Sequence, residues 1–308
     1  MTKTHSPKTF PGWIRQPWPS GEAFSEVKSL LGDLRLHTVC QSAHCPNQSE
    51  CWGRKTATFM VMGNTCTRHC SYCAVNSGKP GELDLDEPEH IAEAVRRLGL
   101  KHTVLTSVTR DDLPDGGAGH IARTIRAIKA STPETTIEVL VQDFDGKRED
   151  IARVQAAGPE IFSHNIETVN SVFSRIRDRR FTYEQSLEVL RIAREYSDGR
   201  FIKSAFMLGC GETPDEIEQT LRDLKAAGCD AVSIGQYLQP TPKHFPVQAY
   251  IAPERFKEIE ALAWNIGFGF AVAGPFVRSS YRSEALLESA YAQSRMAGNE
   301  IESAPHAD

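Results

Sequence analysis

The stretch TATFMVMGNTCTRHCSYC, residues 56–73, joins a short apolar run to a loop that carries three cysteines. The run is apolar at successive positions, which is typical of a strand buried on both faces of a parallel sheet. Cys66, Cys70 and Cys73 follow with the spacing C-x3-C-x2-C. In such sheets the functional residues gather where the strands end. We therefore expect a site at the carboxyl end of this first strand.

Five more apolar runs follow, and amphipathic helical patterns separate them. The helix expected at 213–228 has Thr213 as its N-cap, a proline in its first turn and Glu216 at the third position. Similar patterns occur at 87–100 and 252–267. The five runs are HTVLTSVT, TIEVLVQDF, IFSHNIET, IKSAFMLG and AVSIGQYL.

Six strand–helix units in succession require a parallel sheet with right-handed crossovers. Eight units would close a (β/α)8 barrel, which is about two more than the pattern contains. We therefore predict an α/β fold, an open, partial β/α barrel of the TIM type, with residues 269–274 as an extra strand. A doubly wound sheet is the structural alternative, and periodicity alone does not separate the two.

The predicted barrel occupies residues 56–275. Residues 1–55 have little periodic pattern apart from a short helix expected at 25–34, and we interpret them as an N-terminal extension. Residues 276–308 form a C-terminal segment that contains the sequence RSSY. We expect both extensions to cover the site.

The composition is that of a globular protein, with 40% hydrophobic and 24% charged residues among 308. The net charge of −5 argues against nucleic acids or anionic membranes as partners. The chain lacks an apolar run of about 18 residues that would cross a membrane. Its first residues also lack the apolar core of a signal peptide. We expect a cytoplasmic protein.

Clustered cysteines in a reducing compartment indicate metal ligands or catalysts rather than disulfides. Cys40, Cys45 and Cys51 form a second triplet upstream of the first, with the spacing C-x4-C-x5-C. Cys210 and Cys229 stand apart from both triplets, and we expect them to be small buried hydrophobic residues.

The triplet at 66–73 is compatible with two kinds of metal site. A structural zinc site takes four ligands, and His69 is available as the fourth, although it adjoins Cys70. Three thiolates on a cubane iron–sulfur cluster instead leave one iron open to a small molecule. The spacing alone leaves both interpretations open.

The C-x3-C-x2-C motif with Tyr72 before its last cysteine resembles the radical S-adenosylmethionine superfamily. Members bind this cofactor at the open iron and cleave it to a 5′-deoxyadenosyl radical. Together with the upstream triplet, the chain resembles the lipoyl synthase family from about Trp13 to Tyr281. The shared stretches are LHTVC, CPNQSECW, TATFMVMGNTCTRHCSYC, TSVTRDDLPDGGA, HNIET, IGQYL and GPFVRSSY.

This resemblance implies the insertion of two sulfur atoms, at C6 and C8 of an octanoyl chain bound to a lysine of a carrier protein. It implies S-adenosylmethionine and two [4Fe–4S] clusters as cofactors. Cys66, Cys70 and Cys73 would hold the catalytic cluster. Cys40, Cys45 and Cys51 would hold an auxiliary cluster that is consumed as the sulfur source. A serine of RSSY would be its fourth ligand, Ser280 in preference to Ser279, and His44 would not be a ligand.

The resemblance also suggests further contacts and partners. Tyr72, Asn165 and Glu167 would contact the cofactor, and Lys203 and Gln236 the cofactor or the substrate. Arg278 would neutralise cluster charge or pair with a carboxylate, and Asp111 and Asp112 would cap a loop. The partners would be octanoylated lipoyl carrier proteins (the glycine cleavage H protein and E2 subunits of 2-oxoacid dehydrogenases), a ferredoxin or flavodoxin as electron donor, and an iron–sulfur carrier that rebuilds the cluster. We expect a monomer.

Three alternatives stay open from the sequence. The first is another radical S-adenosylmethionine sulfurtransferase with an auxiliary cluster. The second is a non-enzymatic iron–sulfur carrier, which would not explain the polar residues at the strand ends. The third is a zinc-binding structural protein.

Overall fold

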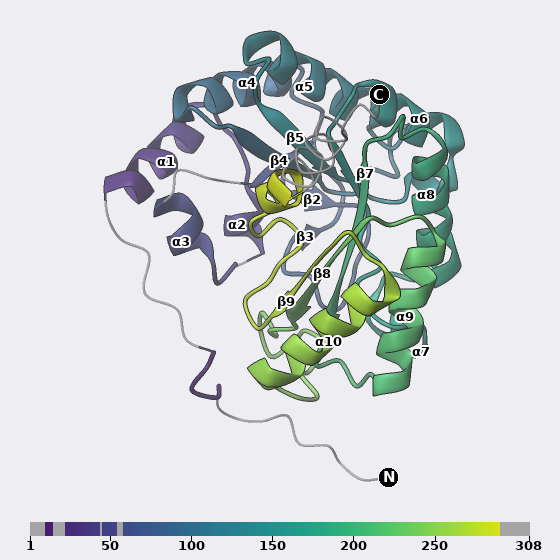
Figure 1. Ribbon diagram of the computed structural model, residues 1–308. Coiled ribbons are helices and arrows are strands. Elements are labelled where there is room, and N and C mark those ends of the chain that lie inside the picture. Colours follow the sequence, from purple (N-terminus) through teal and green to yellow (C-terminus); the bar gives the residue numbers. More distant parts are fainter. Residues whose placement is uncertain (1–9, 15–21, 44, 54–57, 290–308) are drawn as a thin grey trace, which may run out of the picture.

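The computed structural model describes residues 10–14, 22–43, 45–53 and 58–289 (Figure 1). A single parallel sheet of seven strands forms its centre, and each strand pairs with the next one along the chain. A doubly wound sheet would reverse this order at a switch point, so that alternative is wrong. The strands are β1 (Thr58–Val61), β4 (His102–Ser107), β5 (Thr136–Leu140), β6 (Ile161–Ser163), β7 (Phe201–Leu208), β8 (Ala231–Gln236) and β9 (Phe270–Gly274).

Within the described residues β1 and β9 do not pair, so the barrel is open, as predicted. The extra strand expected at 269–274 is confirmed as β9, which pairs with β8. None of the helices in the described residues has the length and apolar character needed to cross a bilayer. His44, the boundary at residue 55 and the tail from 290 to 308 lie outside the described residues.

An outer layer of helices follows the sheet around (Figure 1). The cap expected on α9 is present, because the Thr213 side chain accepts from the N–H of Glu216 and the Glu216 carboxylate accepts from the N–H of Thr213. The helices expected at 87–100 and 252–267 are α4 and α10. The helices are α4 (Glu87–Leu98), α5 (Ala118–Ser131), α6 (Arg148–Ala156), α7 (Asn170–Ile176), α8 (Tyr183–Glu195), α9 (Pro214–Ala226) and α10 (Pro253–Ile266), with a 3-10 turn, η1 (Phe144–Gly146).

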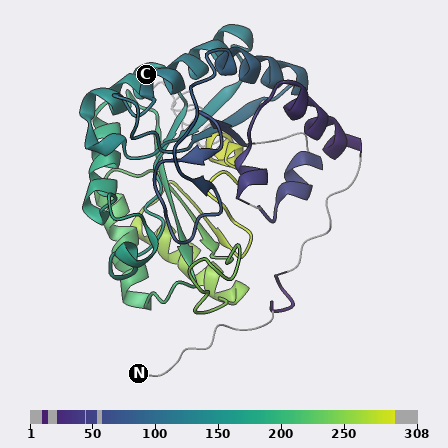
Figure 2. The same cartoon turned by 180° about the vertical axis from the view of Figure 1, so that it is seen from behind.

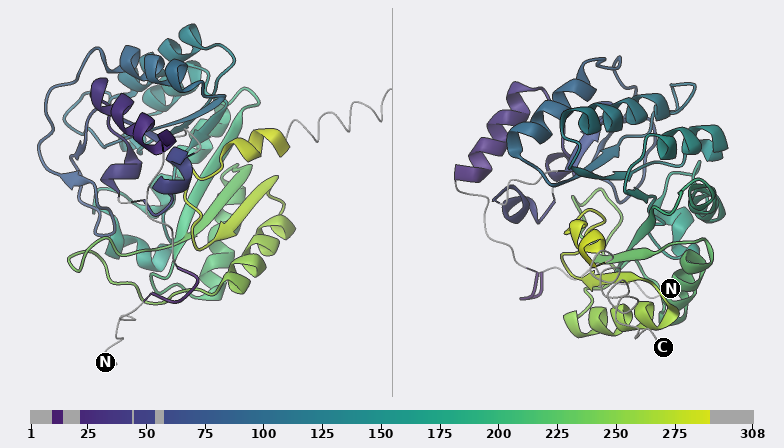
Figure 3. Two further views of the ribbon diagram at one scale, coloured as in Figure 1. Left: turned by 90° about the vertical axis from the view of Figure 1, so that its left-hand side faces the viewer. Right: turned by 45° about the horizontal axis from the view of Figure 1, so that its top comes forward.

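The N-terminal extension covers the exposed edge of β1 (Figure 3). Its helices are α1 (Glu22–Asp33), as expected, and two short ones, α2 (Val39–Ser42) and α3 (Gln48–Gly53), that periodicity did not predict. The N–H of Met60 donates to the carbonyl of His37 (2.9 Å), and Thr38 forms an antiparallel bridge with Phe59. These bonds use edge groups that the open barrel would otherwise expose.

The cysteine loop lies across the sheet on one side. Residues between β1 and α4 form two further short strands, β2 (Thr65–Cys66) and β3 (Asn76–Ser77), which pair with each other in parallel. Viewed from behind, this dark blue segment crosses in front of the sheet (Figure 2). The loop therefore forms part of the wall of a cavity at the end of the barrel.

Candidate active site

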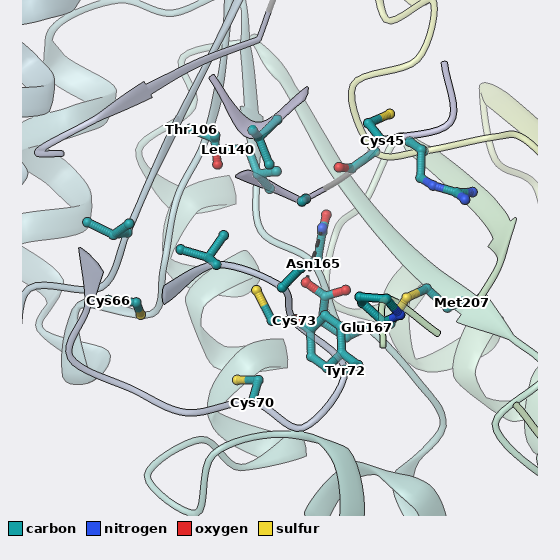
Figure 4. A pocket seen from close by; sticks show the side chains of 18 of the residues that line it. Cys45, Cys66, Cys70, Tyr72, Cys73, Thr106, Leu140, Asn165, Glu167 and Met207 are labelled. Carbon is teal, nitrogen blue, oxygen red and sulfur yellow. Dashed lines mark hydrogen bonds between the residues drawn. The ribbon is translucent and has the colours of Figure 1, made fainter. Parts of the chain in front are cut away.

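A cavity of about 490 Å³ opens where the strands end (Figure 4). The thiols of the cysteine loop lie toward one side of it, and Cys45 of the N-terminal extension lies on the other. Cys40, Cys51 and Lys203 do not line the cavity. The predicted site residues that do line it are Cys45, Cys66, Cys70, Tyr72, Cys73, Asn165, Glu167, Gln236, Ser279 and Ser280.

The cysteine loop presents its sulfur atoms to main-chain donors. The Sγ of Cys66 accepts from the N–H groups of Arg68 (3.4 Å) and Thr109 (3.3 Å). The Sγ of Cys70 accepts from the N–H of Asp178 (3.3 Å). Such donors stabilise the negative charge of metal-bound thiolates. None of the eight cysteines forms a disulfide, so the donor set fits an iron–sulfur cluster.

Burial raises the pKa of the Cys73 thiol to about 12, and the nearby Cys70 and Cys66 raise it further. The three thiols are thus close enough to repel one another when ionised. Within the described ranges no three Cys, His, Asp or Glu side chains converge as they would on a single metal ion. The thiolates of a cubane bind separate irons and lie further apart. The exposed ring of His69 contacts Ser77 (3.2 Å) and is not part of the cavity wall, which argues against zinc.

An ion network fixes the loop from within. The Arg68 guanidinium, 3% exposed, pairs with Asp111 (2.7 Å) and Asp143 (2.8 Å) and stacks on the Phe181 ring. Asp111 also pairs with Arg180 (3.0 Å). The Asp111 carboxylate is thus an ion-pair partner, and its expected role as a loop cap stays a prediction. Asp112 likewise pairs with Arg110 (2.8 Å).

A second polar group lies at the strand ends around Glu167. Arg177 donates to the hydroxyl of Tyr72 (3.1 Å) and lies 3.5 Å from the Glu167 carboxylate. Asn165 donates to the same carboxylate (3.2 Å). Glu167 has a φ of 68°, which is strained for a residue other than glycine. Main-chain hydrogen bonds to β7, from the Glu167 N–H to Ala205 O and from the Met207 N–H to Glu167 O, hold it there.

Three buried side-chain atoms beside Glu167 have no hydrogen-bond partner among the described residues. They are the Oδ1 of Asn165, the Nε2 of His164 and the Nε of Arg177, and all three residues line the cavity. Unpartnered buried polar atoms are rare, and at a cavity wall they indicate a polar ligand. Burial also lowers the pKa of His164 to about 4, so its ring is neutral near pH 7. The residues therefore fit a bound nucleoside or amino acid.

Lys203 and Gln236 use their polar atoms inside the protein. The Lys203 ammonium pairs with Glu138 (2.9 Å) and donates to the carbonyl of Ser279 (2.5 Å). The Gln236 amide donates to three main-chain carbonyls and accepts from the N–H of Ile251. Their expected contact with the cofactor or substrate stays a prediction.

The upstream triplet lies on the two short helices and the loop between them, with Cys40 on α2 and Cys51 on α3. Burial raises the pKa of Cys40 to about 11, and the neighbouring Cys45 raises it further. Burial also raises the pKa of Cys45, and the positive charge of the half-buried Arg278 opposes that shift. Arg278 is thus close enough to neutralise charge at this triplet.

The C-terminal segment brings the RSSY serines to the same place. Thr58 on β1 lies beside these serines and next to Cys40, because its hydroxyl donates to the hydroxyl of Ser280 (3.1 Å) and its main chain lowers the pKa of Cys40. Asn47 donates to the carbonyl of Phe276 (2.7 Å). The Tyr281 hydroxyl donates to Glu50 on α3 (3.1 Å). Residues more than 220 positions apart in sequence, such as Thr58 and Ser280, therefore lie side by side.

Sequence reasoning missed several residues of this site. Arg68, Thr58, His164 and Arg177 were not singled out, although each contacts a predicted residue or the cavity. His164 precedes Asn165 in the quoted HNIET stretch, and this position at a strand end is the signal that was available. Cys210 and Cys229 are both buried, as expected.

Comparison with known proteins agrees with this geometry. Residues 60–235 match the radical SAM superfamily, and residues 1–45 match the N-terminal domain of lipoyl synthase of that family. The lipoyl synthase of Thermus thermophilus is 50% identical over 275 residues, covering 89% of this chain and 85% of that enzyme. This chain belongs to the lipoyl synthase family. It is accordingly a radical SAM enzyme of the sulfurtransferase class, which uses S-adenosylmethionine and [4Fe–4S] clusters.

Other relatives of this lipoyl synthase family member lead to the same assignment. The lipoyl synthase of Rubrobacter xylanophilus is 48% identical and covers 91% of this chain and 87% of its own. The mitochondrial lipoyl synthase 1 of Pisum sativum is 46% identical, with 89% and 74% covered. Among solved structures, methylornithine synthase superposes with a TM-score of 0.53 at 13% identity, covering 84% of this chain and 87% of its own. That likeness shows the fold alone.

Proposed function

We propose that this chain inserts two sulfur atoms, at C6 and C8 of an octanoyl chain attached to a lysine of a lipoyl carrier protein. One observation carries the proposal. Cys66, Cys70 and Cys73 of one triplet and Cys45 of the other line one cavity, and Thr58, which lies next to Cys40 of the upstream triplet, bonds to Ser280 of the C-terminal segment. A cavity between two such sets of cysteines suits an octanoyl chain, which must meet a radical source on one side and a sulfur source on the other.

Cys66, Cys70 and Cys73 would hold one of two [4Fe–4S] clusters, and the main-chain donors to Cys66 and Cys70 support this. When bound, this cluster and S-adenosylmethionine supply a radical that removes hydrogen from carbons too weakly acidic for any side-chain base. The protein's own contribution is to bind, orient and exclude water.

Tyr72, Asn165 and Glu167 would bind S-adenosylmethionine. Its sulfonium is a cation, and the Glu167 carboxylate is a suitable neighbour inside a cavity of low dielectric. The unpartnered Oδ1 of Asn165 is an acceptor for its amino or hydroxyl groups. Arg177, 7% exposed in its side chain and paired with Glu167 and Tyr72, holds both in position.

Cys40, Cys45, Cys51 and Ser280 would hold the second cluster, which serves as the sulfur-donating substrate. A serine oxygen is a hard ligand for iron that otherwise has thiolates, so this bond should be the first to break. Ser280 is preferred to Ser279, since the Ser280 hydroxyl is the one that bonds to Thr58, whose main chain lies next to Cys40.

We further propose the partners that this chemistry needs. They are octanoylated lipoyl carrier proteins such as the glycine cleavage H protein and the E2 subunits, a ferredoxin or flavodoxin as electron donor, and an iron–sulfur carrier that rebuilds the consumed cluster. We propose that the enzyme acts as a monomer.

The test is an anaerobic assay with reconstituted protein, S-adenosylmethionine, dithionite and an octanoyl-lysine peptide. We expect the acyl mass to show two hydrogens replaced by sulfur, together with 5′-deoxyadenosine. Cys70→Ala should abolish 5′-deoxyadenosine, whereas Cys45→Ala should keep it and lose sulfur insertion. Wild-type protein that holds both clusters but forms neither product would favour a non-enzymatic iron–sulfur carrier.

A further inference from the structure

Two segments cover the outer side of the cysteine loop and are joined to it through the main chain. The N–H of Ser71 donates to the carbonyl of Ile176 (2.8 Å), and the N–H of Phe245 donates to the carbonyl of Ser71 (2.8 Å). The N–H of His69 donates to the Asp178 carboxylate (2.8 Å). We call the surface formed by residues 69, 71, 175–180 and 243–245 the loop rim.

Apart from Arg177, the loop rim faces away from the cavity. Cys70 and Tyr72 line the cavity, whereas His69, between Arg68 and Cys70, is exposed and does not. Four of the five Arg and Lys residues of the rim are also exposed and absent from the cavity wall, and they are Arg175, Arg179, Arg180 and Lys243; the fifth, Arg177, lines the cavity. A protein docked on the rim would therefore leave the cavity open to the octanoyl chain.

The rim is strongly basic within an acidic protein. The run at 175–180 is Arg-Ile-Arg-Asp-Arg-Arg, whereas the whole chain has a net charge of −5. Asp178, its one carboxylate, pairs with Arg180 (2.9 Å) and is 10% exposed. In the described part of the chain no carboxylate forms an ion pair with Arg175, Arg179 or Lys243. These three cations create a local positive potential that steers acidic partners.

The rim also touches the catalytic thiols. The N–H of Asp178, in the middle of the basic run, donates to the Sγ of Cys70 (3.3 Å). His244 is within hydrogen-bond distance of the Cys73 carbonyl (3.1 Å). A redox group brought to this surface would be separated from the cysteine ligands by a single layer of polypeptide.

Building on the proposed function, we propose that the loop rim is the docking surface for an acidic one-electron carrier protein of the flavodoxin type. In each transfer the reduced carrier loses one electron, and the cluster bound by Cys66, Cys70 and Cys73 accepts it. Charge complementarity suits this partner, because it speeds encounter and gives a complex that salt weakens and that separates quickly.

The experiment compares a protein donor with a chemical one. The variant Arg175→Glu with Arg179→Glu reverses two rim charges without removing a side-chain hydrogen bond to the loop. The control, Arg126→Glu with Lys257→Glu, makes the same change in net charge on the exposed faces of α5 and α10. Formation of 5′-deoxyadenosine is measured with reduced flavodoxin over a range of salt concentrations and, separately, with dithionite. Binding of oxidised flavodoxin is measured by calorimetry, without turnover.

We expect the rim variant to bind flavodoxin about tenfold more weakly and to lose most of its salt dependence. Its rate of 5′-deoxyadenosine formation with flavodoxin should fall accordingly, while its rate with dithionite should match wild type. The control variant should match wild type in both assays. Flavodoxin binding equal to that of the control would overturn the proposal. An equal loss of rate with dithionite, together with a raised KM for the octanoylated carrier protein, would also overturn it, because the rim would then bind the substrate protein. Wild type that binds flavodoxin but forms no 5′-deoxyadenosine with dithionite would instead contradict the proposed function.

Discussion

Replacing Lys203 with methionine tests how the barrel interior holds the C-terminal segment. The Lys203 side chain is 2% exposed and pairs with Glu138, which is 0% exposed. Glu138 also accepts from the hydroxyl of Ser163 (2.6 Å). The same ammonium donates to the carbonyl of Ser279, beside the proposed ligand Ser280. Lys203→Met would remove both interactions and leave the Glu138 carboxylate buried without its cation.

The expected cost follows from that burial. Removing one partner of a buried ion pair lowers the free energy of unfolding by about 3–5 kcal/mol, whereas removing the charge of both partners is often close to neutral. Adding Glu138→Gln to Lys203→Met removes the second charge and keeps an acceptor for Ser163. The double variant should therefore recover most of the stability. Neither variant restores the bond to Ser279, so both should insert sulfur more slowly than wild type.

The stability assay is anaerobic urea unfolding of the cluster-loaded proteins. The number of clusters in each protein is counted by iron and sulfide analysis. Lys129→Met is the matched control, since Lys129 and Glu160 form a pair whose side chains are 32% and 27% exposed. That pair should contribute about 0–1 kcal/mol. If Lys203→Met costs no more than Lys129→Met, or if the double variant recovers full sulfur insertion, this account of Lys203 is wrong.

Three further predictions concern the cavity. Ser280→Ala should reduce sulfur insertion at least about tenfold while 5′-deoxyadenosine still forms. Ser279→Ala should have little effect, because the structure holds Ser279 through its carbonyl. Both results are read from product masses, and equal losses would contradict the choice of Ser280. Asn165→Ala should raise the KM for S-adenosylmethionine, since hydrogen bonds to charged groups contribute about 1.5–3 kcal/mol; an unchanged KM measured from initial rates would exclude the contact. In protein freed of iron, Cys73 should stay protonated at pH 8, because burial raises its pKa to about 12. Its rate of alkylation by iodoacetamide, followed by peptide mass, should therefore keep rising with pH above 9. The rate for an exposed thiol levels off there.

Much of the fold followed from local patterns. The apolar runs became the strands, and Thr213 with Glu216 capped α9 where expected. These features depend on neighbouring residues, and a linear pattern records them well. The short helices α2 and α3 were not expected, because helices of four and six residues are too short to show a period. Tertiary packing around Trp52, which is 0% exposed, holds them instead.

The candidate site also has residues that the sequence predicted and residues that it did not. Spacing and resemblance identified the cysteines, and the cavity gathers most of them with Asn165 and Glu167. The residues that position them were harder to predict, since their partners are distant in sequence. Arg177 reaches Tyr72 across 105 positions, and Lys203 reaches Ser279 across 76. Contacts between residues so far apart in the sequence leave no period or motif. Arg177 also lies in a basic run, and such a run is typical of an ordinary solvated surface.

The two triplets are held in different ways, which suit a cluster that stays intact on one triplet and a cluster that is consumed on the other. The loop with Cys66 and Cys70 is fixed by main-chain donors to sulfur and by the buried Arg68, which the rest of the barrel surrounds. The upstream triplet lies outside the barrel, on short helices that cover the edge of β1. If its cluster is consumed, its ligands must open and close again in each cycle. Short segments at an open edge can do so without disturbing the sheet, because few of the sheet's own hydrogen bonds depend on them. The open barrel is therefore as relevant to the proposed function as the cavity itself.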